Sequence, residues 1–108
     1  MGGTRMDFAE FTRSLQLDEA PRPAGLELSP QLLALWQDAR GRWDDAHRTV
    51  QAHDDAASAQ VHAYLHRVEG DLANARYWYT RAGVEPCDAA LEEEWQQLVL
   101  AHLADTDR

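Results

Sequence analysis

Two histidines and a glutamate within one short stretch have the clearest chemical potential in this sequence. His62 and His66 are four positions apart, and Glu69 follows three positions later. On an α-helix these spacings place all three side chains on one face. Two imidazoles on one face suit a transition-metal ion such as zinc, with the carboxylate as a third ligand or as a hydrogen-bond partner of a ligand.

The same spacing also has a structural interpretation. Histidines four residues apart commonly serve as hydrogen-bonded groups at the rim of a core. A dedicated metal site would need further ligands from another helix, and His47, His102 or Asp71 could supply them. We therefore expect no cofactor. The alternative is zinc or another transition metal bound by the two histidines and the glutamate.

The stretch that carries these residues predicts two helices joined by a tight turn. Gly70 ends the first helix, because glycine adopts the left-handed conformation without a steric penalty. Asp71 is then a good N-cap for a second helix, which ends at Gly83. Two helices joined so tightly must pack on each other. The apolar stripes that this predicts are Val61, Tyr64, Leu65 and Val68 on the first helix, and Leu72, Ala75, Tyr79 and Ala82 on the second.

The N-terminal part of the chain predicts a short helix followed by a linker. Asp7 with Glu10 three positions later resembles a capping box, so we expect a helix over residues 7–17. Residues 18–28 contain two prolines and a glycine, which predicts an extended segment. Residues 1–28 are therefore assigned to an N-terminal helix and a proline-rich linker.

Two further segments between the linker and the central hairpin have clear signals. Ser29 before Pro30 predicts the start of a helix that ends at Gly41. A second helix is expected from residue 42 to about residue 50, and the polar residues 52–58 predict a loop.

The segment after the central hairpin predicts a break and then one last helix. Pro86 marks the break, and Asp88 can cap a helix that ends near Ala104. Three glutamates at positions 92–94 favour the positive end of the helix dipole, and we expect them to be solvated. Cys87 lies just before this helix, has no partner cysteine, and is interpreted as a packing residue.

Length and composition limit the class of protein. A chain of 108 residues is expected to form one domain. The absence of alternating apolar runs predicts an all-α fold. The net charge of −9 argues against nucleic acid or an anionic membrane surface as the partner. No long apolar run and no signal peptide are present, so we expect a cytoplasmic protein.

Two segments 29 residues apart share one pattern. GRWDDA at residues 41–46 and GDLANA at residues 70–75 both read glycine, any, apolar, any, any, alanine. This pattern resembles the tetratricopeptide repeat (TPR), in which a glycine turn precedes the second helix of a helical hairpin. Ala75, Tyr79 and Ala82 match the small, aromatic and small positions of that helix.

The resemblance covers roughly residues 30 to 86. The first unit departs from the pattern, with Val50 at the aromatic position and His53 at the second small one, while Pro86 lies near the closing proline. The resemblance implies antiparallel helical hairpins stacked on one another, with the last helix capping the open end. Residues 29–108 are therefore expected to form a helical-repeat-like domain. Three segments of the central hairpin, VHAYLHR, EGD and NARYWYTRAG, also look like those of a family of small uncharacterised bacterial proteins. This resemblance implies no particular activity.

One surface has the composition of a protein-binding site. The helix over residues 72–82 carries aromatic and arginine side chains opposite its apolar stripe, and these residue types are enriched at interaction hot spots. The alternative is that Tyr77 and Trp78 pack against the last helix. We assign six residues to the proposed surface: Tyr64, Arg67, Asn74, Tyr77, Trp78 and Arg81.

The sequence favours binding over catalysis. It contains no glycine-rich phosphate loop, nucleophile elbow or zinc-protease motif. The leading expectation is a non-enzymatic module that binds or scaffolds a protein, a peptide or a second copy of itself. The alternative, from a different class, is a small metal-binding protein or metal-dependent enzyme that uses His62, His66 and Glu69.

Overall fold

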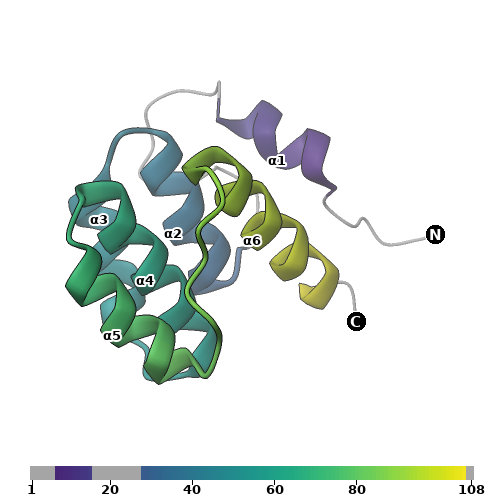
Figure 1. Ribbon diagram of the computed structural model, residues 1–108. Coiled ribbons are helices and arrows are strands. Elements are labelled where there is room, and N and C mark those ends of the chain that lie inside the picture. Colours follow the sequence, from purple (N-terminus) through teal and green to yellow (C-terminus); the bar gives the residue numbers. More distant parts are fainter. Residues whose placement is uncertain (1–6, 16–27, 107–108) are drawn as a thin grey trace.

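The chain folds into helices connected by short turns (Figure 1). The computed structural model describes residues 7–15 and 28–106. These residues form α1 (Phe8–Ser14), α2 (Pro30–Ala39), α3 (Trp43–Gln51), α4 (Ala56–Glu69), α5 (Leu72–Ala82) and α6 (Leu91–Thr106), with no strand among them. The all-α prediction is therefore confirmed, while the predicted linker at residues 18–28 lies almost wholly outside the described residues.

The predicted helix boundaries are set by local hydrogen bonds. Asp7 and Glu10 form both bonds of the capping box. The Ser29 hydroxyl accepts from the backbone N–H of Leu32, one turn into α2. Gly70 has φ of +88°, the left-handed conformation that ends α4.

Three boundaries differ from the prediction. The helix α1 ends at Ser14 rather than at residue 17, and the N–H of Leu15 bonds to the carbonyl of Thr12. Residues 52–58 are not all loop, because α4 begins at Ala56; the Asp55 side chain accepts from the backbone N–H and the hydroxyl of Ser58. This cap allows the alanines that follow to join the helix. At the other end of the chain, α6 begins at Leu91 rather than directly after Asp88, and its first turn bonds to the carbonyl of Ala90.

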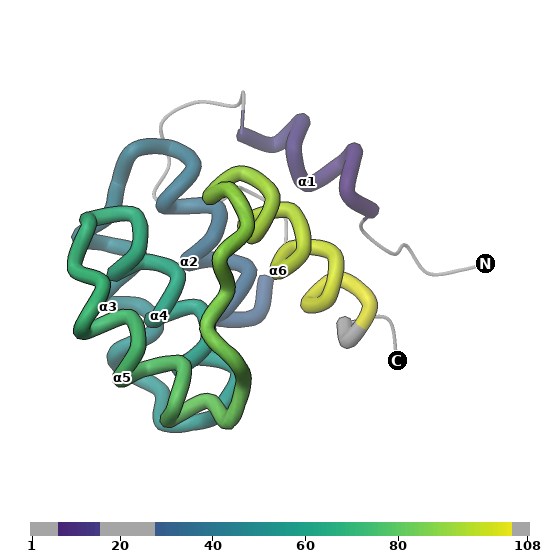
Figure 2. The backbone as a smooth tube through the Cα atoms, in the orientation of Figure 1, coloured from purple at the N-terminus to yellow at the C-terminus, as the bar shows by residue number. Residues whose placement is uncertain are grey.

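The helices pack as two adjacent hairpins covered by α6. α2 packs on α3 and α4 packs on α5, while α3 and α4 are in contact with each other. α6 packs on α2 and α4, and α1 packs on the other side of α6 (Figure 1). Figure 2 shows residues 83–90 running as an extended connection from the end of α5 back to the start of α6.

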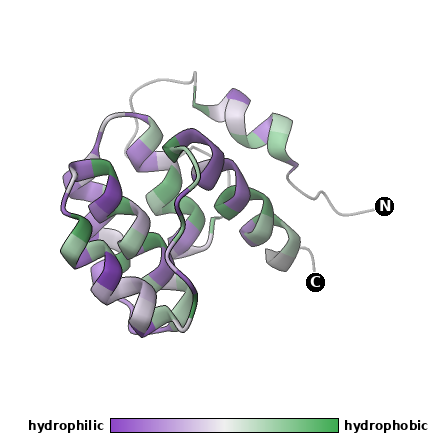
Figure 3. Cartoon of the chain, in the orientation of Figure 1, coloured by the Kyte–Doolittle hydropathy of each residue, from purple (hydrophilic) through white to green (hydrophobic). Residues whose placement is uncertain are grey.

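The core is formed by the apolar stripes of these helices. Hydrophobic and hydrophilic residues are interleaved along every helix (Figure 3), as expected for amphipathic helices that each bury one face. Trp36 is fully buried, and its indole N–H donates to the Ser14 hydroxyl. Trp95 of α6 packs against Phe8 and Phe11 and donates to a carbonyl of α2. One predicted stripe residue, Leu72, is instead 59% exposed.

A buried polar network joins α4, α5 and α6. Glu94, which the sequence predicted to be solvated, is only 2% exposed. Its carboxylate accepts from the Arg67 guanidinium and from the Tyr79 hydroxyl, both at 2.6 Å. Arg67 also donates to the carbonyl of Ala89 at 2.7 Å. Burial and the neighbouring Glu94 carboxylate raise the pKa of Tyr79, so the phenol stays protonated and keeps donating.

Candidate metal site

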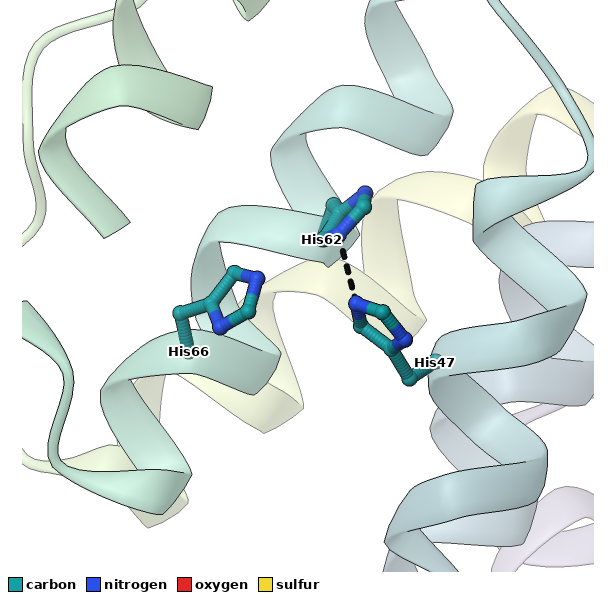
Figure 4. Close-up of side chains that lie close together, drawn as sticks. All are labelled: His47, His62 and His66. Carbon is teal, nitrogen blue, oxygen red and sulfur yellow. Dashed lines mark hydrogen bonds between the residues drawn. The ribbon is translucent and has the colours of Figure 1, made fainter. Parts of the chain in front are cut away.

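Three histidines from two helices meet in one cluster (Figure 4). His62 and His66 lie on the face of α4 that turns towards α3, and His47 of α3 completes the group. The three residues each offer one ligand nitrogen, and these nitrogens lie within 4.8 Å of one another. We call His47, His62 and His66 the histidine cluster.

The rings are held at short distances from one another. The Nε2 atoms of His47 and His62 are 2.9 Å apart and share one hydrogen bond. The His62 and His66 rings are stacked, with centroids 5.0 Å apart and an interplanar angle of 23°. The His47 ring meets both of them edge-on, at 86° and 72°. The ring nitrogens therefore converge on a common space between α3 and α4 (Figure 4).

Glu69 fixes the orientation of one imidazole. The His66 Nδ1 atom lies 2.8 Å from a carboxylate oxygen of Glu69, one turn further along α4. A carboxylate accepts, so Nδ1 carries the proton and donates. The other ring nitrogen of His66 then has a free lone pair, and it points towards His47 and His62 (Figure 4). A histidine held by a carboxylate in this way is the usual arrangement of a metal-ligating imidazole.

Two tryptophans enclose the cluster. Trp78 of α5 stacks on His62, with centroids 3.9 Å apart and an interplanar angle of 12°. Trp43, one turn before His47 on α3, stacks on the His47 ring at 4.9 Å. The indole N–H of Trp43 donates to the carbonyl of Leu65 at 2.7 Å, which ties α3 to α4 beside the cluster. The rings are thus positioned by packing as well as by hydrogen bonds.

Burial disfavours the charged form of two cluster histidines, His47 and His62. His62 is 4% exposed and His66 is 6% exposed. Burial, with the neighbouring imidazoles of His47 and His66, lowers the pKa of His62 to about 4. Burial also lowers the pKa of His47, whereas the carboxylates of Glu69 and Asp44 act in the opposite direction. Neutral imidazoles are the form that binds a metal ion.

The other candidate ligands lie elsewhere. Glu69 and Asp71 form a second group with His66, but both residues are exposed, and Glu69 bonds to Nδ1 of that ring. His102 is buried on α6 and belongs to neither group. Of the three residues predicted for a metal site, His62 and His66 thus lie in one cluster. Glu69 is not a member of this cluster but holds the ring of His66 through its Nδ1 atom.

The six residues predicted to form a protein-binding surface do not lie on one surface. Tyr64 is 4% exposed, and its hydroxyl donates to Asp38. Arg67 is bound within the buried network described above. The four residues of α5 divide as well: Tyr77 is 52% exposed, Arg81 is exposed, Asn74 bonds to the cap residue Asp71, and Trp78 packs on His62 rather than on α6.

Sequence reasoning singled out two of the three cluster histidines. His47 was named only as one of several possible additional ligands, because nothing in the sequence states which helix packs against α4. The one available signal is that His47 follows Trp43 by four positions, so that both lie on one helix face.

Comparison with known proteins does not add to this assignment. No protein-family model, curated protein sequence or solved structure matches the chain.

Proposed function

We propose that this protein binds a divalent transition-metal ion, with zinc as the best-suited metal, through His47, His62 and His66. The observation that carries the proposal is the convergence of three ring nitrogens within 4.8 Å from two packed helices. Imidazole nitrogen is a preferred ligand of Zn²⁺, Cu²⁺ and Ni²⁺, whereas Mg²⁺ and Ca²⁺ prefer oxygen.

The observed spacing is close to that of a loaded site. Zinc binds imidazole nitrogen at about 2.0–2.1 Å, which in a tetrahedral site separates two ligand nitrogens by roughly 3.3 Å. The 2.9 Å between the Nε2 atoms of His47 and His62 would open slightly, and the His66 nitrogen would approach. Small rotations of the three side chains would supply these shifts.

The partners around the cluster support metal binding rather than simple packing. A core histidine needs a hydrogen bond for each ring nitrogen, which separate polar partners could provide. Here two imidazoles bond to each other, and the third is held by Glu69 so that its free lone pair faces them. On metal binding the proton shared by His47 and His62 would leave, and the lone pairs of all three rings would then face the cation.

The metal content of the protein tests this proposal. Untagged protein purified without chelator should contain about one transition-metal ion per chain, since one cluster offers one site. The double variant His62→Ala/His66→Ala should contain none, and His53→Ala, which alters an exposed histidine outside the cluster, should retain the metal. Circular dichroism checks that the variants remain helical. Equal metal content in all three proteins would refute the assignment.

A second candidate function, binding of a protein or peptide, rests on the exposed side of α5. Tyr77 is 52% exposed, and Arg81 contacts both the Tyr77 hydroxyl and the face of Trp78. Exposed aromatic and arginine side chains in contact are typical of interaction hot spots. The resemblance to TPR hairpins supports this candidate, and a cytoplasmic location is part of it.

Alanine substitutions separate the two candidates. Tyr77→Ala and Arg81→Ala should weaken capture of a partner, or self-association of the chain, while leaving both the helical content and the metal content unchanged. If both variants still capture the partner as well as the wild type does, this surface is not the binding site.

A further inference from the structure

A cavity lies between α5 and the extended connection over residues 83–90, and it opens to solvent. Its volume is about 140 Å³. The lining consists of four residues of α5, Pro86 and Cys87 of the connection, and Arg67 of α4. None of these residues belongs to the histidine cluster, so a ligand in this cavity would bind apart from the metal site.

Much of the cavity wall is apolar. Leu72, Ala75 and Pro86 line it with hydrocarbon, and Cys87 packs beside Ala75 in the smaller of the two apolar clusters. Leu72 is 59% exposed, so a ligand that covered it would remove apolar surface from water. An apolar cavity of roughly 150 Å³ is large enough to hold benzene, so this space suits one six-membered ring or a short alkyl chain.

Two guanidinium groups border the cavity, and only one of them is neutralised by the protein. Arg67 donates to the Glu94 carboxylate and to the carbonyl of Ala89, so its charge is already compensated. Arg76 is exposed, and its guanidinium forms no hydrogen bond or ion pair with any residue that the structure describes. An unpaired guanidinium can donate two parallel hydrogen bonds to a carboxylate.

The other charges near the cavity leave this contact available. In the described part of the chain, no aspartate or glutamate lines the cavity, and the Tyr79 hydroxyl already donates to Glu94. The net charge of −9 repels an anion at long range. Salt screens exposed charges beyond about 8 Å at physiological ionic strength, so the direct contact with Arg76 outweighs the distant charges.

We propose that this cavity binds a small organic carboxylate. The apolar group of the ligand lies against Leu72, Ala75 and Pro86, and its carboxylate accepts from the Arg76 guanidinium. The volume limits the apolar group to about one ring. This binding is independent of the metal ion proposed for the histidine cluster.

Benzoate, benzamide and benzamidine provide the test, because they share one ring and carry a negative, no and a positive charge. Each is titrated into untagged protein at a constant ionic strength of about 0.15 M, and the backbone amide signals are followed by NMR. Benzoate should shift the signals of Ala75 and Cys87 to saturation, with a Kd on the order of millimolar. Benzamide should bind about five-fold more weakly, and benzamidine more weakly still.

Arg76→Gln removes the unpaired cation, and Arg48→Gln is the matched control. Arg48 is also an exposed helical arginine, but it lies on α3 and does not line the cavity. Benzoate and benzamide should bind Arg76→Gln with equal Kd values, whereas Arg48→Gln should keep the preference for benzoate. Unchanged amide spectra away from the substitution show that each variant is folded.

Alkylation of Cys87 gives a second readout, since it is the only cysteine of the chain. Benzoate should slow its reaction with iodoacetamide, which is uncharged, in proportion to the occupied fraction of the cavity. Equal binding of benzoate and benzamide by the wild type, or a preference for benzoate that persists in Arg76→Gln, would refute the carboxylate site. Benzoate-induced shifts confined to α3 and the facing part of α4 would place the anion at the histidine cluster and equally overturn the proposal.

Discussion

Acid should destabilise the metal-free protein through His62 as the pH falls below the ordinary pKa of an imidazole. The pKa of this imidazole is about 4 in the folded chain, against an ordinary value of 6.5. Between these two pH values the His62 imidazole binds a proton in the unfolded chain but stays neutral in the folded chain. The stabilisation is therefore complete above pH 6.5 and is lost as the pH falls towards about 4.

The shift in the pKa of His62 sets an upper limit on this loss of stability. The fall in pKa from 6.5 to about 4, at ~1.36 kcal/mol per pH unit, corresponds to an upper limit of ~3 kcal/mol. Some of this loss is relieved, because a protonated His62 can donate to the Nε2 lone pair of His47, 2.9 Å away. We expect a loss of about 2 kcal/mol in the free energy of unfolding.

Urea unfolding with a chelator present measures this loss. The free energy of unfolding is compared at about pH 7 and at about pH 4.5 for the wild type and for His62→Gln, which does not titrate. The wild type should lose about 2 kcal/mol more than the variant, and His53→Gln, which alters an exposed histidine, should behave as the wild type. Identical losses in the wild type and His62→Gln would refute the reasoning.

Three further predictions follow from the fold and the site. Glu94→Ala leaves the buried Arg67 guanidinium without its carboxylate, so it should cost about 3 kcal/mol in urea unfolding, whereas Glu93→Ala on the exposed side of α6 should cost less than ~0.5 kcal/mol. Gly70→Ala should cost about 1 kcal/mol from backbone strain alone, since φ is +88° and an added Cβ meets no atom within 4 Å. Zinc at 100 times its Kd should raise the free energy of unfolding by ~2.7 kcal/mol, and His47→Ala should lose this gain in thermal unfolding.

The local features of this fold were accessible from the sequence. Ser29 before Pro30 and Asp71 after Gly70 mark helix starts through hydrogen bonds that form within four residues. The turn at Gly70 also places two helices against each other without reference to any other part of the chain. The shared face of His62 and His66 follows from helix geometry in the same way.

The features that depend on long-range packing were not accessible. His47 joins the histidine cluster only because α3 packs on α4, and the sequence does not state the rotation of either helix. Glu94 was expected in solvent because three adjacent glutamates begin α6, yet one of them must face α4 and meets Arg67 there. Periodicity alone could have shown that one glutamate points inwards, but not which partner it would find.

A zinc titration of metal-free, untagged protein by isothermal calorimetry tests the central claim most directly. The account predicts binding of one zinc ion per chain by the wild type and by His53→Ala, and loss of that binding in His47→Ala. The last variant is decisive because His47 enters the site only through the packing of α3 on α4. Zinc binding that is unchanged by His47→Ala, or absent from the wild type, would contradict the account.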